Sequence, residues 1–412
     1  MEIRPILSAL LRSKTGAILV ALQVAISLAI LSNALHIVNL RQAVAQRPSG
    51  IADESSVIYA NVRHLRKGSA NEQFAEQQLE TDTLRAVSGV TSVAFSSQMP
   101  MSRSGSNNSV AIDRKQVTPT ANASFYFSPD SLVKTFGLKV VEGRDLLPQE
   151  ALMIDGDTAA EEVFPPTVLV TRALAEKAWP GTSAIGKTLY FGTGEKANGA
   201  RVVGVIERLQ SQSAEIGDRG EYVTIVPMRL ANGYATLYAM RVEPGQRERV
   251  MKDAEAALRK ASATPVIIKM KAVEEDRRDR YRADIALSWM LITVSILLLL
   301  VTASGIVGIA SLWVTQRRKQ IGVRRALGAR RVDILRYFLT ENFIITSVGV
   351  VTGVLLAIAL NQLLVSKLEM AKLPLNYLFA GAGVFWALGV IAVYGPAWRA
   401  ATISPATATR SA

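Results

Sequence analysis

The chain has 412 residues, a formal net charge of +13 and a mean hydropathy of +0.22, which is high for a soluble protein of this length and points to membrane spans. The chain contains no cysteine, which excludes a disulfide framework, a zinc ribbon, an iron–sulfur site and a cysteine nucleophile. Its two histidines, His36 and His64, are too few for a two-histidine metal motif such as H-E-x-x-H.

The N-terminal part of the chain predicts a membrane anchor. Residues 1–16 carry three basic residues and one acidic residue, and their apolar residues share one helical face, so we expect a short amphipathic helix on the inner membrane surface. The charge-free stretch 15–40 exceeds the roughly 20 residues that span a bilayer and predicts a first transmembrane helix at 17–40. Residues 43–45 (Ala-Val-Ala) resemble a signal-peptidase site, but the apolar run is longer than in a usual signal peptide, which favours an uncleaved helix.

The segment 41–284 is long enough for one or two compact domains, and its pattern mixes strands with helices. We predict an α+β domain with an early half at about 50–150, which about 235–280 completes, and a β-rich later half at about 165–235.

Apolar periodicity and turn residues predict the elements of this segment. Ser128-Pro129-Asp130 predicts the start of a short helix that Gly137 ends, and Thr171 is predicted to cap a helix at 171–178. A helix at 72–87 has as its apolar positions Phe74, Leu79, Leu84 and Val87. The other predicted elements are a helix at 247–260, a loop at 104–109, and strands at 57–62, 90–95, 168–170, 188–191, 200–206, 222–226, 237–242 and 266–270.

Residues 181–188 (GTSAIGKT) satisfy the P-loop pattern letter for letter, with Lys187 in the phosphate-binding position. A functional P-loop follows a strand and opens a helix, because the helix N-terminus and the loop amides bind the phosphates. Here a predicted helix precedes the motif and a predicted strand follows it, so we interpret the segment as a tight turn. Ser131 and Lys134 match a serine-acylase pair, but its partner motifs are missing. We find no catalytic constellation and expect that the chain is not an enzyme.

Three further charge-free stretches predict transmembrane helices at 285–314, 342–366 and 373–396. The first would extend about 45 Å as one helix, which is longer than a bilayer requires, so we expect it to continue as a stalk. Gly349-x-x-x-Gly353 predicts close helix packing, either inside one subunit or between two subunits of a dimer. None of the four predicted spans has an internal charged residue, which is untypical of a polar substrate path or a proton relay.

Basic residues predict the orientation of these spans. The loop 315–341 carries eight Lys and Arg residues against one Asp before Glu341, and both chain ends are also basic. By the positive-inside rule, this loop, the N-terminus and the tail 397–412 are cytoplasmic, while 41–284 and the short loop 367–372 lie outside. The positive charge is therefore a topology signal and not the footprint of a nucleic-acid partner.

The same loop predicts an amphipathic helix after Gly328-Ala329, which continues into the third span. The apolar residues near its one face are Val332, Ile334, Leu335, Phe338 and Leu339. The residue pattern of this loop is compatible with two interpretations. The loop is either a positive-inside anchor or a coupling element on which a cytoplasmic partner pushes.

The chain resembles the FtsX-like, MacB-type permeases of ABC transporters over nearly its full length. Residues 317–329 match the family pattern Arg-x-x-Glu/Gln-Ile-Gly-hydrophobic-Arg-Arg-Ala-Leu-Gly-Ala, and residues 395–401 with Ser404-Pro405 resemble its closing segment. Further similar motifs are Ile334-Leu335, Phe338-Leu339, Glu341, Gly137-Leu138, Glu142-Gly143-Arg144, 168–171, Trp179-Pro180-Gly181, Ile185-Gly186-Lys187 and 202–206. The family has Pro-Gly…Ile-Gly-Lys as structure, which accounts for the false P-loop.

The resemblance implies a bacterial inner-membrane protein with four transmembrane α-helices and a large α+β periplasmic domain between helices 1 and 2. It implies a dimer, with a second copy or a paralogue, and two ATPase subunits that bind ATP and Mg, so we expect no cofactor in this chain. Only 16 residues precede the first span, so we expect ATP hydrolysis by a separate subunit. The residues expected to contact that subunit are Arg317, Ile321, Gly322, Arg324, Arg325, Leu327, Gly328, Ala329, Ile334 and Leu335. Gln320 stands where Glu is usual, which puts a charge contact there in doubt.

In that family, motion of the ATPases passes through the inner loops and stalk helices to the outer domains, where the substrate is handled. The resemblance thus implies efflux of a periplasmic substrate such as an antibiotic, a peptide or a lipid, and leaves open whether a periplasmic membrane-fusion protein and an outer-membrane channel take part. An FtsX-type activator of a cell-wall hydrolase and an antibiotic-sensing permease remain alternatives. The size of the outer domain favours export over the first, and the count of four spans argues against the second.

Overall fold

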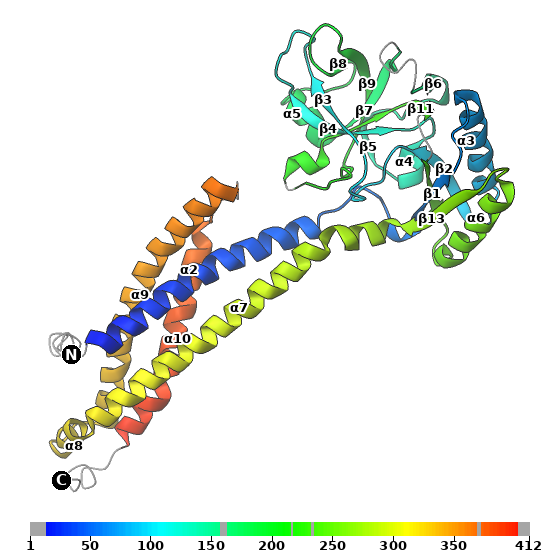
Figure 1. Ribbon diagram of the computed structural model, residues 1–412. Coiled ribbons are helices and arrows are strands. Elements are labelled where there is room, and N and C mark those ends of the chain that lie inside the picture. The colour runs from blue at the N-terminus through cyan, green and yellow to red at the C-terminus, as the bar shows by residue number, and fades with distance from the viewer. Residues whose placement is uncertain (1–13, 157–162, 216, 232–234, 369–371, 403–412) are drawn as a thin grey trace. The chain divides into compact units, whose positions relative to one another are not determined.

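A computed structural model describes residues 14–156, 163–215, 217–231, 235–368 and 372–402 (Figure 1). The chain divides into two compact units, a helical unit of Met1–Ala43 with Asp284–Ala412 and an outer unit of Val44–Ala283. The amphipathic segment expected at the N-terminus and the Ser404-Pro405 motif lie outside the described residues, apart from the last residues of the former.

Four helices of the described chain are long and apolar enough to cross a membrane, as the hydropathy pattern predicts. They are α2 (Lys14–Ala45), α7 (Val273–Gln316), α9 (Arg331–Leu368) and α10 (Leu375–Ala401). The helices α2, α7 and α9 extend beyond both ends of the predicted spans, and α10 extends beyond the C-terminal end. The reason is that a helix can continue through polar residues, whereas a hydropathy pattern detects only its apolar part. α7 begins twelve residues before 285, and α9 begins inside the predicted loop.

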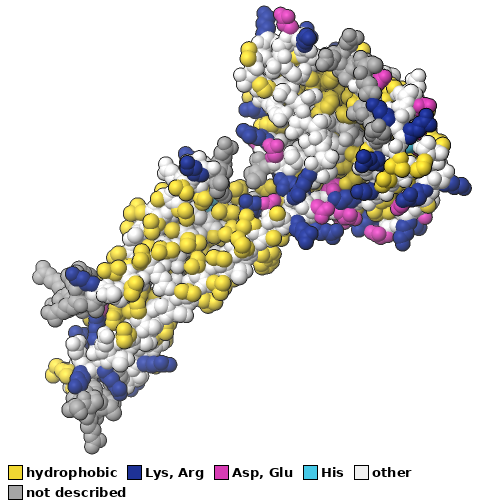
Figure 2. All heavy atoms as spheres, in the orientation of Figure 1, with side chains coloured by type: hydrophobic (Ala, Val, Ile, Leu, Met, Phe, Trp, Pro, Cys, Tyr) yellow, Lys and Arg dark blue, Asp and Glu magenta, His cyan; other side chains and the backbone are white. Residues whose placement is uncertain are grey.

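The helical unit packs around α2, whose apolar window is the most buried of the four, whereas that of α7 is the least buried. Gly349 and Gly353 of α9 both face α2 of the same chain. A Cβ atom on Gly349 would lie 2.8 Å from the Ala21 carbonyl oxygen, and one on Gly353 would lie 2.9 Å from that of Ala25. The two glycines therefore permit a close helix approach inside one subunit. Apolar side chains cover the outer surface of these helices, as a lipid environment requires (Figure 2).

The outer unit contains a four-stranded sheet in the order β13-β1-β12-β2, with all pairs antiparallel. Its strands are β1 (Val57–His64), β2 (Val90–Ser96), β12 (Ala235–Val242) and β13 (Val266–Ala272). The helices α3 (Ala70–Arg85) and α6 (Arg247–Ala261) pack on this sheet through Leu84, Val250 and Leu258. The sheet thus joins the two ends of the outer segment.

A seven-stranded sheet in the order β5-β9-β7-β10-β4-β3-β8 forms the rest of the outer unit, with a small β11-β6 pair beside it. Its strands are β3 (Asn107–Ala111), β4 (Ala121–Phe127), β5 (Val140–Gly143), β7 (Thr167–Thr171), β8 (Thr188–Phe191), β9 (Asn198–Ile206) and β10 (Val223–Val226). The small pair consists of β6 (Leu152–Asp155) and β11 (Met228–Ala231).

Strands β3, β4 and β5 belong to this second sheet, although the sequence division places them in the early half of the domain. The reason is non-local pairing, because β4 pairs with β10 and β5 pairs with β9. The loop predicted at 104–109 is also wrong in its second part, since β3 begins at Asn107. Periodicity in a single short strand does not reveal its partner.

Two predicted helix details are corrected. The buried face of α3 is mostly polar, with Gln73, Gln77 and Glu80 on it, while Leu79 is 53% exposed. Thr171 stands at the N-cap of α5 (Arg172–Ala178), but its hydroxyl donates to the Glu221 carbonyl oxygen and caps nothing.

The short helix α4 (Leu132–Phe136) starts later than the Ser128-Pro129-Asp130 signal predicts. Ser131 caps it by accepting a hydrogen bond from the Lys134 amide at 2.9 Å. Gly137 ends the helix at a φ of +63°, as predicted.

Candidate functional site

The basic loop between α7 and α9 is a helical hairpin with a tight turn. It contains α8 (Arg318–Ala326), and Gly328 ends that helix at a φ of +95°, a conformation that favours glycine. The amide of Ala329 donates to the Arg324 carbonyl oxygen at 3.0 Å, so the turn closes the helix C-terminus. In the first turn of α9, the Asp333 carboxylate accepts a hydrogen bond from the Arg330 amide at 2.9 Å and so stabilises the helix N-terminus. The sequence A-L-G-A-R-R-x-D therefore encodes a defined turn.

Arg317 forms a buried ion pair at the base of this hairpin. Its Nη1 lies 2.9 Å from both carboxylate oxygens of Glu341, whose side chain is 1% exposed. The guanidinium also lies 5.8 Å from the centroid of the Trp313 ring. Arg317 therefore connects the end of α7 to α9, and the carboxylate of Glu341 in the same chain neutralises its charge. The sequence motif includes both residues but does not reveal that they pair.

The two arginines of the Arg-Arg pair support the turn from outside. The guanidinium of Arg324 lies 5.1 Å from the centroid of the Tyr337 ring and remains exposed. Arg325 Nη1 donates to the Ala329 carbonyl oxygen at 3.1 Å. Arg324 is thus the member of the pair whose charge faces solvent.

The apolar residues expected at the partner contact separate into two groups. Ile321 and Ile334 are 5% and 4% exposed and pack in the core of the helical unit, with Gly322 buried and Ala329 and Leu335 half-buried. Leu327 is 83% exposed. Val332 is 52% exposed, so its predicted place on the apolar face with Ile334 is wrong. The reason is helix geometry, because two residues in sequence are about 200° apart around the helix axis, so Val332 points away from the bundle when Ile334 faces it.

The loop exposes apolar and basic side chains, which together we call the loop patch. It consists of Val323, Leu327 and Val332 with Arg324, Arg330 and Arg331. Val323 of α8 and Leu327 at its C-cap are four residues apart and lie on one helical face. Exposed leucine and valine beside arginine are typical of a protein contact. The sequence motif does not state which apolar positions are buried, so it does not distinguish the exposed Val323 and Val332 from the buried Ile321.

The P-loop-like segment lies between α5 and β8, as a helix-to-strand turn. Gly181 and Gly186 have φ values of +69° and +79°. Lys187 Nζ donates to Thr182 Oγ1 at 2.6 Å and lies 5.5 Å from the centroid of the Trp179 ring. Lys187 thus forms a hydrogen bond within its own turn, and the strand β8 follows the motif where a P-loop has a helix. The phosphate-binding geometry is therefore missing from this segment, as predicted.

The first turns of α7 are bound tightly within the outer unit. Arg277 makes two hydrogen bonds to Glu54 at 2.7 and 2.6 Å and one to the Ala45 carbonyl oxygen at 2.9 Å. Tyr281, which is 1% exposed, donates to Gln210 at 3.2 Å. Sequence reasoning noted only a charged run here. In the residues that the structure describes, no group of three or more His, Asp or Glu side chains is placed to hold a metal ion.

Four apolar helices, an outer unit with two main sheets and an arginine-rich hairpin are the architecture of a multi-pass membrane protein. A family model described as MacB-like periplasmic core domain matches residues 18–259, and one described as FtsX-like permease C-terminal matches residues 292–405. The chain therefore belongs to the MacB-like, FtsX-like family of ABC transporter permeases.

Relatives of this chain carry related names. The macrolide export ATP-binding/permease protein MacB of Syntrophobacter fumaroxidans is 28% identical over 200 residues, which cover 48% of this chain and 28% of that protein. The uncharacterized ABC transporter permease YvrN of Bacillus subtilis is 25% identical over 313 residues, which cover 71% of each chain. This chain thus spans only 28% of the length of the MacB relative. The solved periplasmic region of MacB from Actinobacillus actinomycetemcomitans matches at 13% identity and a TM-score of 0.33, over 58% of this chain and 97% of that one.

Proposed function

We propose that this chain is the permease subunit of an ABC exporter in the bacterial inner membrane. It transmits the motion of a separate, ATP-hydrolysing cytoplasmic subunit to its periplasmic domain, for export of a periplasmic substrate such as an antibiotic, a peptide or a lipid. Membership of the permease family supports a role in an ABC transporter. The name of the MacB relative, a macrolide export protein, supports export. The single observation that carries the coupling role is the loop patch, with apolar side chains exposed around an ordered turn.

The hairpin has the properties of a rigid lever. The hairpin resists displacement because Ile321 and Ile334 are buried in the core of the helical unit. The ion pair between Arg317 and Glu341 holds it further. Because Arg317 directly follows α7, the displacement reaches that helix at once. The 44 residues of α7 extend about 66 Å at 1.5 Å per residue, without a proline. At its other end, Arg277 and Tyr281 secure α7 to the outer unit.

The proposal includes an assembly and an orientation. The loop and both chain ends are cytoplasmic, and the outer unit is periplasmic, which the positive-inside rule supports. A second permease, either a copy or a paralogue, completes a dimer on two ATPase subunits that supply ATP and Mg. A periplasmic membrane-fusion protein and an outer-membrane channel belong to the exporter form of this proposal.

Affinity purification of the tagged chain from native membranes, followed by mass spectrometry of its partners, tests the proposal. We expect recovery of an ABC ATPase, and we expect Leu327→Glu and Arg324→Glu to reduce that recovery about ten-fold or more, because each places a negative charge on the loop patch. Leu79→Glu changes an equally apolar exposed residue of the outer unit and should leave recovery unchanged.

Unchanged ATPase recovery in both loop variants would refute the coupling surface. A cell-wall hydrolase recovered in place of a membrane-fusion protein would favour the FtsX-type alternative over export. Gly328→Pro tests the turn itself, since proline does not adopt the positive φ of this position.

A further inference from the structure

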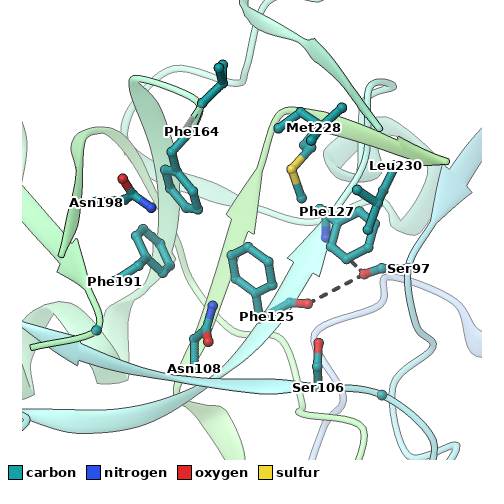
Figure 3. A pocket seen from close by; sticks show the side chains of 14 residues that line it. Ser97, Ser106, Asn108, Phe125, Phe127, Phe164, Phe191, Asn198, Met228 and Leu230 are labelled. Atoms are coloured by element: carbon teal, nitrogen blue, oxygen red, sulfur yellow. Dashed lines mark hydrogen bonds between the residues drawn. The ribbon is translucent and has the colours of Figure 1, made fainter. Parts of the chain in front are cut away.

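A pocket of about 570 Å³ opens in the outer unit beside the seven-stranded sheet (Figure 3). Its wall is aromatic. Phe125 and Phe127 come from β4, Phe191 ends β8, and Phe164 precedes β7. Met228 of the small sheet lies across from them. A volume of this size is within the range of small-molecule sites, roughly 300–1,000 Å³.

The four rings form one connected surface and not separate core residues. The centroids of Phe164 and Phe191 are 4.8 Å apart, those of Phe125 and Phe191 are 5.5 Å apart, and those of Phe125 and Phe127 are 5.8 Å apart. Phe125 and Phe191 are nearly buried, whereas Phe127 and Phe164 are half-buried, so part of the ring surface faces the open space. Such a surface favours a further aromatic ring at van der Waals distance.

Two amides face the same space from β3 and β9, two strands that both pair with β8. Asn108 lies on β3 and Asn198 begins β9, and Figure 3 shows both side chains beside the phenylalanine rings. Within the part of the chain that the structure describes, neither side-chain amide has a hydrogen-bond partner, whereas the Ser97 hydroxyl is bonded to the Phe127 amide at 3.0 Å. Each free amide offers donors and an acceptor to a ligand.

The described residues that line the pocket include no Asp, Glu, Lys or Arg. A charged ligand group would lose its hydration here without gaining a counter-ion, which costs several kcal/mol. An uncharged ligand loses nothing of this kind. The described part of the lining therefore favours an uncharged ligand.

We propose that this pocket binds an uncharged small molecule that places an aromatic ring against the four phenylalanines and a carbonyl or hydroxyl group against the amide of Asn108 or Asn198. Naming this molecule as the exported substrate class rests on the proposed function, while the binding site itself rests on the pocket alone.

Benzophenone is a suitable probe, because it is an uncharged diaryl ketone that crosslinks to nearby C–H bonds under ultraviolet light. The purified full-length chain in lipid nanodiscs is irradiated with increasing benzophenone, and the labelled peptides are identified by mass spectrometry. Lipid partition gives non-saturating labels on the transmembrane helices. We expect saturable labelling of peptides that contain Phe125, Phe164, Phe191 or Met228, and about ten-fold weaker labelling there by benzophenone-4-carboxylate.

Two variants and a matched control complete the experiment. Asn108→Asp keeps the side-chain shape but adds a charge, and Phe164→Ala removes one ring, and each should reduce the saturable label about ten-fold. Trp179→Ala should change it less than about two-fold, because Trp179 is a half-buried aromatic residue of the same core cluster outside the pocket lining.

Label confined to the transmembrane helices, or equal saturable label from both probes and in all variants, would overturn the proposal. The measurement needs no ATPase subunit, so a failure here with normal ATPase co-purification rejects the pocket alone. Pocket labelling without any ATPase partner would instead reject the proposed function and keep the binding site.

Discussion

At the scale of single residues, a buried histidine joins α3 to the first strand of the outer unit. His64 of β1 is 9% exposed, and its Nε2 lies 3.0 Å from Glu80 Oε1 of α3. The Tyr238 hydroxyl donates to the other oxygen of the same carboxylate. The hydrogen bond with Glu80 raises the pKa of His64 above its ordinary value of 6.5, because the negative carboxylate favours the protonated ring.

The raised pKa has a defined consequence for stability. A raised folded-state pKa contributes stability that is fully present below pH 6.5 and is lost as the pH rises through the folded-state pKa of His64. We therefore expect the α3 amides to be better protected from hydrogen exchange at pH 6 than at pH 8. The comparison uses protection factors, which correct each exchange rate for its intrinsic pH dependence. His64→Gln should remove this difference and cost about 1–2 kcal/mol at pH 6. His36→Gln, which changes the other histidine of the chain, should retain it; equal pH dependence in both variants would argue against the assignment.

The ion pair between Arg317 and Glu341 permits a double-variant test. Arg317→Met leaves a buried carboxylate without a partner and should destabilise the helical unit by about 3–5 kcal/mol. The double variant Arg317→Met, Glu341→Leu removes both charges and should recover most of this loss. Thermal unfolding of the purified chain measures both effects. Additive losses in the double variant would show that the two side chains do not act as a pair.

At the scale of elements, the close approach of α9 to α2 depends on two glycines. Gly353→Val places a branched side chain where a Cβ alone would lie 2.9 Å from a backbone oxygen, so we expect a loss of about 1–3 kcal/mol. Gly383 of α10 is exposed, and a Cβ added there would meet nothing within 4 Å, so Gly383→Val serves as the control. The melting temperature of the purified chain distinguishes the two. An equal effect of both variants would mean that overall helix propensity, and not the α2 contact, is responsible.

Sequence patterns predict these elements unequally. The strands at 57–62 and 237–242 are visible because long apolar runs with β-branched residues have one favoured structure. Five strands escape sequence reasoning, namely β3, β4, β5, β6 and β11. All of them except β4 have only four or five residues, and each is stabilised by its partner in a sheet. Helix α3 shows the converse, since its capping box of Ser69 and Glu72 is local, but its polar buried face is explained only by Glu80 meeting His64 and Tyr238.

At the scale of the whole molecule, the native absence of cysteine makes the orientation directly testable. Val117→Cys in the outer unit replaces a residue that is 89% exposed, and Lys319→Cys replaces an exposed residue of α8. In intact spheroplasts, a membrane-impermeant maleimide should label the first and not the second, because the proposed orientation places the basic loop in the cytoplasm. Permeabilised spheroplasts should label both, which controls for reactivity. Labelling of Lys319→Cys in intact spheroplasts would reverse the proposed orientation.

Hydropathy, charge and motif spacing are properties of consecutive residues. The sequence alone therefore predicts the four apolar helices, the lack of a functional P-loop at 181–188 and the family of the chain. Other features required distant residues to meet. The contact of Gly353 with α2 and the pairing of Arg317 with Glu341 both depend on contacts between separate segments of the chain. The aromatic pocket likewise draws its rings from strands that are far apart in the chain, and no local pattern records which strands become neighbours.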